Sequence, residues 1–124
     1  MLMYEAIRDF AKQFEFEPRV VNEKKWKKFK KFIVAGMGGS HLAADLLKAW
    51  QPELDLYTHK DYGLPPVKGE DLKNSLIIAS SYSGNTEEAI SAYDAALRGN
   101  LALAVAASGG KLLDLAEKAS VPYI

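Results

Sequence analysis

The sequence has 124 residues, of which 48% are hydrophobic and 26% charged, and its formal net charge is zero. This size and balance are typical of one globular domain that buries its own core. The absence of cysteine excludes disulfide bonds and thiolate chemistry, and it suits the reducing cytoplasm in which we expect the protein. The sequence has neither a signal peptide nor an apolar run near the about 18 residues of a membrane span, so no membrane partner is expected.

The first part of the chain, residues 1–31, is expected to be a helical segment. Tyr4, Ile7, Ala11 and Phe14 recur at the spacing of an amphipathic helix, and Pro18 follows where a helix would stop. A second, lysine-rich helix is predicted to begin near Asn22.

Positive charge is concentrated in this segment, in which nine Lys or Arg face five Asp or Glu. One interpretation is a nucleic-acid-binding patch. The other is the solvated face of the lysine-rich helix, with Trp26 and Phe29 pointing inward. We favour the second, and expect no nucleic-acid partner, because no nucleic-acid-binding module is recognisable elsewhere in the sequence.

From residue 32 onward the pattern alternates between strands and helices. The apolar runs predict strands at 32–35, 54–57, 76–79, 101–106 and 121–124, and amphipathic helices are predicted between them over 42–50, 87–98 and 112–119. Strands that are apolar throughout are buried on both faces, which indicates a parallel sheet. The α/β core, 32–124, is therefore predicted to be a doubly wound, three-layer αβα sandwich of five parallel strands.

Small polar residues follow three of the predicted strands, over 36–40, 80–86 and 107–110. In an open parallel sheet, ligands bind beyond the carboxyl ends of the strands. Each of these loops leads into a helix, and the free N–H groups and positive dipole at the start of a helix attract an anion.

The loop Ser81-Tyr82-Ser83-Gly84-Asn85-Thr86 carries the strongest signal. Ser81, Ser83 and Thr86 place hydroxyl groups beside Gly84, where the absence of a side chain lets backbone approach a ligand. The loop is therefore predicted to bind phosphate without a lysine.

Helix capping is the alternative reading of this loop, because Asn85 and Glu88 have the spacing of a capping box. Capping accounts for Asn85 but not for both serines, so we favour the ligand. Tyr82 is expected either to line the pocket or to pack at the end of the strand.

The loop Gly36-Met37-Gly38-Gly39-Ser40 is a poor dinucleotide fingerprint, because His41 stands where the third glycine belongs and no acidic residue ends the next strand. A dinucleotide-binding half-domain is therefore disfavoured. His41 and His59 have no Asp or Glu at a recognisable metal or triad spacing, and we expect structural or solvent-exposed roles for both.

At these residues the chain resembles the SIS (sugar isomerase) domain family, and in particular the N-terminal SIS half of bifunctional phosphoglucose/phosphomannose isomerases. The resemblance rests on motifs that keep their order across about residues 32–124: Gly36–Ser40, Ser81–Glu88, Ser108–Leu112 and Val121–Ile124.

The resemblance implies a flavodoxin-like strand order. It also implies that Gly39, Ser40, Ser81, Ser83 and Thr86 bind the phosphate of a hexose 6-phosphate, with no metal or organic cofactor. The implied reaction is aldose–ketose isomerisation of glucose 6-phosphate and fructose 6-phosphate, with mannose 6-phosphate as a further substrate, through a cis-enediol.

Such isomerases contain two SIS domains, and no residue in this chain matches their catalytic base. We therefore expect residues 1–124 to be a single SIS domain from a longer protein: inactive alone, free of catalytic residues, and paired with a second copy as a homodimer. The alternative is a non-catalytic SIS module that binds or senses a sugar phosphate.

Overall fold

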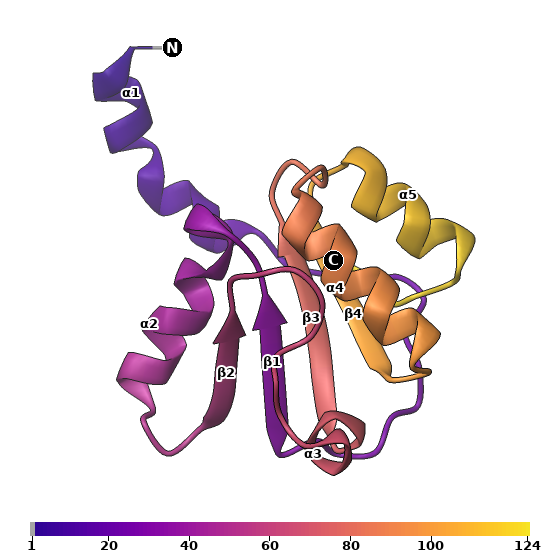
Figure 1. Cartoon of the computed structure of the whole chain (residues 1–124). Coiled ribbons are helices and arrows are strands. Elements are labelled where there is room, and N and C mark those ends of the chain that lie inside the picture. The colour runs from indigo at the N-terminus through magenta and orange to yellow at the C-terminus, as the bar shows by residue number, and fades with distance from the viewer. Residues whose placement is uncertain (1) are drawn as a thin grey trace.

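The structure, a computed structural model, describes residues 2–124 (Figure 1). Along the chain its elements are α1 (Met3–Arg8), the 3₁₀ turn η1 (Phe10–Glu15), β1 (Lys31–Ala35), the 3₁₀ turn η2 (Gly38–His41), α2 (Leu42–Trp50), β2 (Asp55–His59), α3 (Gly69–Lys73), β3 (Ser75–Ser81), α4 (Glu87–Arg98), β4 (Ala102–Ala107) and α5 (Gly110–Lys118).

The centre of the fold is a four-stranded sheet in the order β2-β1-β3-β4. All three pairings are parallel, with Ala35 opposite both His59 and Ala79, and Ser81 opposite Ala107. The prediction of a parallel α/β sheet flanked by helices is confirmed. The register also brings the loops that follow β1, β3 and β4 to one edge.

One face of the sheet carries the main core. β3 alternates between buried and half-buried residues, and Ile77 and Ala79 are completely buried beneath α4 and α5. The side of α4 that meets the sheet is built from small residues around Tyr93, namely Ala89, Ala92 and Ala96. Small side chains let the helix lie close to the strands, and Tyr93 fills the space towards α5, where its hydroxyl donates to the Leu115 carbonyl at 3.0 Å.

The opposite face is only partly covered. Its buried cluster consists of Val34, Ala44 and Leu56, and Ala44 is the one buried residue of α2. The helix predicted over 42–50 is observed, but its apolar side is largely uncovered: Leu46 is 63% exposed and Trp50 is 75% exposed. Ala44 packs against the sheet, Leu47 lines the cavity between the helix and the strands, and Leu46 and Trp50 face solvent.

A fifth strand over 121–124 is not observed. Within the described residues, this segment makes isolated bridges through Tyr123, parallel to Val105 and antiparallel to Val21. Pro122 has no N–H to donate, and the Tyr123 N–H donates to the Val21 carbonyl at 3.0 Å. The segment lies beside β4 without completing a ladder.

The lysine-rich segment is extended, and the prediction of a helix there is wrong. Residues 16–30 contain no helix, and Asn22, the expected N-cap, has a left-handed φ of 58°. Two causes act together: lysines three and four apart repel one another on a helix, and the chain must cross from Tyr123 at the β4 side to the start of β1. Trp26 and Phe29 pack edge to face on each other, with centroids 6.0 Å apart.

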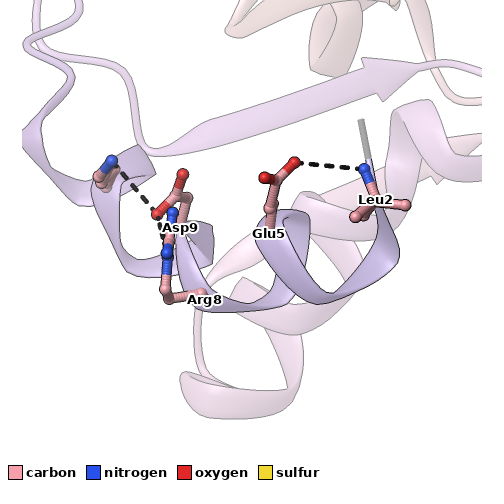
Figure 2. Close-up of polar contacts among 5 residues, drawn as sticks. Leu2, Glu5, Arg8 and Asp9 are labelled. Carbon is pink, nitrogen blue, oxygen red and sulfur yellow. Dashed lines mark hydrogen bonds and ion pairs between the residues drawn. The ribbon is translucent and has the colours of Figure 1, made fainter.

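The predicted first helix is interrupted and lies outside the core. It consists of α1 and η1, which we call the arm (residues 3–15), and it extends away from the sheet (Figure 1). Asp9, at the junction, binds both Arg8 and Lys12 at 3.2 Å, and the Glu5 carboxylate accepts the Leu2 N–H at 3.3 Å (Figure 2). No residue of the arm is buried. Across residues 2–124, no helix is long and apolar enough to cross a bilayer.

Candidate functional site

Hydrogen bonds of the Ser81 side chain hold the loop after β3 in shape. This side chain is completely buried, its Oγ accepts the Gly84 N–H at 3.0 Å, and it shares a hydrogen bond of 2.8 Å with the Thr86 hydroxyl. Ser83 is exposed, and its Oγ accepts the Asn85 N–H at 3.1 Å. The loop therefore offers an exposed Ser83 hydroxyl and a half-buried Thr86 hydroxyl at its rim, while Ser81 fixes its shape.

Ser40 joins the loop after β1 to the loop after β3. Its Oγ accepts the Tyr82 N–H at 3.2 Å, and its carbonyl accepts the Ser80 hydroxyl at 2.8 Å. Gly36 allows this approach, since a Cβ there would lie 3.0 Å from the Ser80 carbonyl oxygen. Gly39 is exposed beside Ser40. Two of the three predicted loops are thus bound together through one serine.

Two glycines hold the loop after β4 against the loop Ser81–Thr86, which we call the serine loop. Gly84 and Gly110 have left-handed φ values of 77° and 73°, which glycine adopts at little cost. A Cβ on Gly84 would lie 1.7 Å from the Gly109 carbonyl oxygen, and one on Gly110 would lie 2.2 Å from that of Ser83. The two backbones touch directly, and the Leu112 N–H donates to the Gly84 carbonyl at 2.8 Å.

Asn85 has a role that the sequence interpretation missed. The alternative reading, a capping box on α4, is wrong, because the N-cap is Thr86 and no side chain caps that helix. The Asn85 Oδ1 instead accepts the Lys111 N–H at 3.0 Å, in the first turn of α5. A cap supplied by another loop has no signature in local spacing, so the sequence could not have placed it.

A cavity of about 700 Å³ opens beside these loops. Its lining includes Gly39, Ser40, Ser80, Tyr82 and Ser108, one or two from each loop. Ser81, Ser83 and Thr86 lie in the adjoining turn and are not part of this lining. Tyr82 is 83% exposed at its mouth, so the alternative of a packed aromatic is wrong.

Ser108 belongs to the third predicted loop but was not among the predicted site residues. Its hydroxyl and its N–H both donate to the Tyr82 carbonyl. The sequence did contain a signal for it, since a serine stands at the carboxyl end of a buried strand here, as Ser81 does at the end of β3.

A histidine–carboxylate pair lies next to Ser40. The His41 Nδ1 is 2.5 Å from the Asp45 Oδ2, and the Thr58 hydroxyl donates to the Asp45 Oδ1 at 3.2 Å. The expectation that no acidic residue pairs with His41 is wrong: residues four apart near a helix start face each other. The hydrogen bond with His41 holds the pKa of the Asp45 carboxyl below its ordinary value, and the Thr58 hydroxyl lowers the pKa further.

The start of α4 carries its own negative charge. Glu87 and Glu88 occupy its first turn, and the Tyr62 hydroxyl donates to the Glu87 Oε2 at 2.9 Å. The hydrogen bond to Glu87, and then the negative charge of Glu87, raise the pKa of the Tyr62 hydroxyl. An anion at this edge would therefore depend on hydroxyl and N–H donors. In the part of the chain that the structure describes, no cluster of three or more His, Asp or Glu could hold a metal ion.

Comparison with known proteins gives one consistent class of relative, although no family model matches the sequence. The chain is 34% identical over 120 residues to the bifunctional phosphoglucose/phosphomannose isomerase of Caldicellulosiruptor bescii, covering 94% of this chain and 34% of that protein. The proteins of the same name from Aquifex aeolicus and Pyrobaculum aerophilum are 31% and 32% identical, over 94% and 86% of this chain and 36% and 34% of their own lengths. The chain is thus a distant homologue of these isomerases and spans about a third of their length.

Proposed function

We propose that this chain is the phosphate-binding part of an aldose–ketose isomerase that acts on glucose 6-phosphate and fructose 6-phosphate, with mannose 6-phosphate as a further substrate. Homology to phosphoglucose/phosphomannose isomerases over most of the chain supports the reaction class. The observation that carries the proposal is the convergence of three small polar loops on one edge of the sheet, tied together by Ser40, Gly84 and Gly110.

In this proposal the phosphate lies against the rim of the serine loop. Ser83 and Thr86 supply hydroxyl donors, Gly39 and Ser40 supply donors from the β1 side, and the start of α4 adds its dipole. Ser81 is already bonded within the loop, and a direct contact between its hydroxyl and the phosphate stays a prediction. Hydroxyl and N–H donors recognise an anion without an arginine or lysine, and hydrogen bonds to a charged group are the stronger kind.

The isomerisation itself requires a base that moves a proton between C1 and C2 of the open-chain sugar. Two carboxylates, Glu87 and Glu88, lie nearest the serine loop in the sequence. Both are in the first turn of α4, and Glu87 accepts a hydrogen bond from the Tyr62 hydroxyl. We assign the base to residues outside 1–124 and expect this chain to bind substrate without turning it over.

Calorimetric titration and a coupled isomerase assay test the proposal. Glucose 6-phosphate and fructose 6-phosphate should bind the 124-residue chain weakly, and unphosphorylated glucose, the matched control, should not bind. No conversion of either sugar phosphate is expected. Equal binding of glucose and glucose 6-phosphate would contradict the phosphate site, and turnover by the isolated chain would contradict the assignment of the base.

A non-catalytic module that senses a sugar phosphate is the second candidate. The two candidates differ in the longer protein: an isomerase requires the full-length protein to convert glucose 6-phosphate into fructose 6-phosphate, whereas a sensor binds without conversion. We also propose that the chain pairs with a second copy as a homodimer.

A further inference from the structure

A carboxylate stands directly beside the proposed phosphate site. Glu87 is the first residue of α4 and follows Thr86, whose hydroxyl lies at the rim of the serine loop. The free N–H groups and the dipole at the start of a helix attract an anion, so a carboxylate in the first turn competes with a phosphate for the same donors. Glu87 is exposed, and packing does not fix its side chain. The direction in which this carboxylate is held therefore matters for phosphate binding.

A tyrosine from another part of the chain holds this carboxylate. The Tyr62 hydroxyl donates to the Glu87 Oε2 at 2.9 Å, and within residues 2–124 Tyr62 is the one side chain that hydrogen-bonds to Glu87. The hydrogen bond to Glu87, and then the charges of Glu87 and Glu88, raise the pKa of the Tyr62 hydroxyl. The hydroxyl therefore keeps its proton at neutral pH and remains a donor to the carboxylate.

The loop between β2 and α3 fixes Tyr62 against α4. On one side of this residue, the His59 Nε2 hydrogen-bonds to the Tyr62 carbonyl oxygen at 3.2 Å. On the other side, the Gly63 N–H donates to the Ser91 Oγ of α4 at 2.9 Å, and Leu64 packs against the main core. The backbone around Tyr62 is thus anchored to both β2 and α4, which places its hydroxyl at the start of that helix.

The engaged carboxylate leaves the donors of the serine loop to a ligand. Among residues 2–124, no N–H or hydroxyl of the serine loop donates to Glu87. The Ser83 Oγ accepts the Asn85 N–H, so its own O–H is left to donate outward. Glu87 lines a separate cavity of about 280 Å³ along α4, and it does not line the cavity of about 700 Å³ beside the loops.

We infer that Tyr62 is a positioning residue of the proposed phosphate site: its hydroxyl holds the Glu87 carboxylate aside, so that a phosphate takes the donors at the start of α4. The inference rests on the proposed function and adds a residue of the β2–α3 loop to it. Without the hydroxyl, Glu87 is free to turn back towards those donors, as acidic side chains at helix starts do. A bound phosphate would then meet a like charge at close range.

Calorimetric titration of the 124-residue chain with glucose 6-phosphate at low salt tests the inference. Tyr62→Phe should weaken binding about fivefold, which is the effect in water of a like charge about 4 Å away. Glu87→Gln should bind at least as tightly as the parent chain, because the amide carries no charge. Tyr57→Phe is the matched control, since Tyr57 is 46% exposed and Tyr62 is 54% exposed, and it should leave the affinity unchanged.

The double variant Tyr62→Phe/Glu87→Gln separates positioning from a purely structural role. If Tyr62 acts through the charge of Glu87, the double variant should bind as tightly as Glu87→Gln alone. The ratio of parent to Tyr62→Phe affinity should also fall towards one in about 1 M salt, where charges are screened within about 3 Å. A loss of packing around the ring would persist in both experiments.

Three outcomes would overturn the inference while glucose 6-phosphate still binds and the proposed function stands. These are a Tyr62→Phe variant that binds as well as the parent chain, an equal loss on removing the hydroxyl in the Glu87→Gln background, and a Glu87→Gln variant that binds more weakly than the parent chain. A parent chain that does not bind glucose 6-phosphate would overturn the inference and the proposed function together.

Discussion

At the scale of single residues, the serine loop separates two kinds of hydroxyl. Ser81 is buried and bonded within the loop, whereas Ser83 is exposed at its rim. The sequence marked both as phosphate ligands because spacing reports which hydroxyls are close and not which way each one faces. Substitution of Ser83 is therefore the more direct test of ligand binding.

We expect Ser83→Ala to weaken hexose 6-phosphate binding by about 1–2 kcal/mol, or roughly 5–30-fold, because a donor to a charged group is lost. Calorimetric titration measures the change, and Ser120→Ala, beyond the end of α5, is the control. If affinity is unchanged while the melting temperature falls, the Ser83 hydroxyl only accepts the hydrogen bond from the Asn85 N–H. Its assignment as a phosphate ligand is then wrong.

Asp45 should contribute to stability in a pH-dependent way. The hydrogen bond with His41 and then the bond from Thr58 lower the pKa of this carboxyl from its ordinary value of 3.8. A lowered carboxyl pKa stabilises the folded state above pH 3.8, and this contribution is lost as the pH falls through the lower, folded-state value. Denaturant unfolding of Asp45→Asn should therefore show a shallower loss of stability below pH 4 than the parent chain. Identical acid profiles would contradict the role of the pair.

Gly84 should tolerate no side chain. In Gly84→Ala the new Cβ would lie 1.7 Å from the Gly109 carbonyl oxygen, at a left-handed φ, so the two loops must separate. We expect a loss of about 2–4 kcal/mol in unfolding free energy, measured by chemical denaturation. Gly69→Ala, where a Cβ meets nothing within 4 Å, should change stability little. Equal stabilities of the two variants would refute the close contact.

At the scale of elements, a tyrosine hydroxyl of α4 bonds to the backbone of α5, in addition to the apolar packing between the two helices. Tyr93 is 1% exposed, and its hydroxyl reaches the Leu115 carbonyl. Tyr93→Phe keeps the ring and removes the bond, so we expect a loss of about 1 kcal/mol, measured by thermal unfolding. Tyr57→Phe on β2, where the tyrosine is 46% exposed, is the control. A Tyr93→Phe variant as stable as the parent would show that the bond contributes nothing net.

The sequence predicted a strand or helix correctly where burial determines the structure. It failed where a contact with a distant part of the chain determines the structure. β1, β3 and β4 are buried on the face beneath α4 and α5 and half-buried on the other face, so continuous apolar runs identified them directly. The segment over 22–31 has helical spacing, yet its course is set by the pairing of Val21 with Tyr123 across the fold. The apolar pattern on α2 predicted the helix correctly, but the side of the sheet beneath it is only partly filled, and Ala44 is its one buried residue.

At the scale of the whole molecule, the meeting of the three polar loops could be predicted from the sequence, but the hydrogen bonds within and between them could not. A parallel sheet brings the carboxyl ends of neighbouring strands together, so the meeting of the Ser40, Ser81 and Ser108 loops followed from strand order alone. The Asn85 cap on α5 and the His41–Asp45–Thr58 chain depend on side-chain directions across loops. Four strands suffice to build this edge, and the missing fifth lies at the far side of β4.

The contact between Gly84 and Gly110 has a consequence for changing this protein by design. The backbones of the two loops touch, although the loops lie about 25 residues apart in the sequence. A change in one loop therefore requires a matching change in the other. Grafting the serine loop of a relative alone would place new backbone against an unmatched neighbour. A transplant that preserves the site must therefore carry the segments 81–86 and 107–111 together, as one cassette.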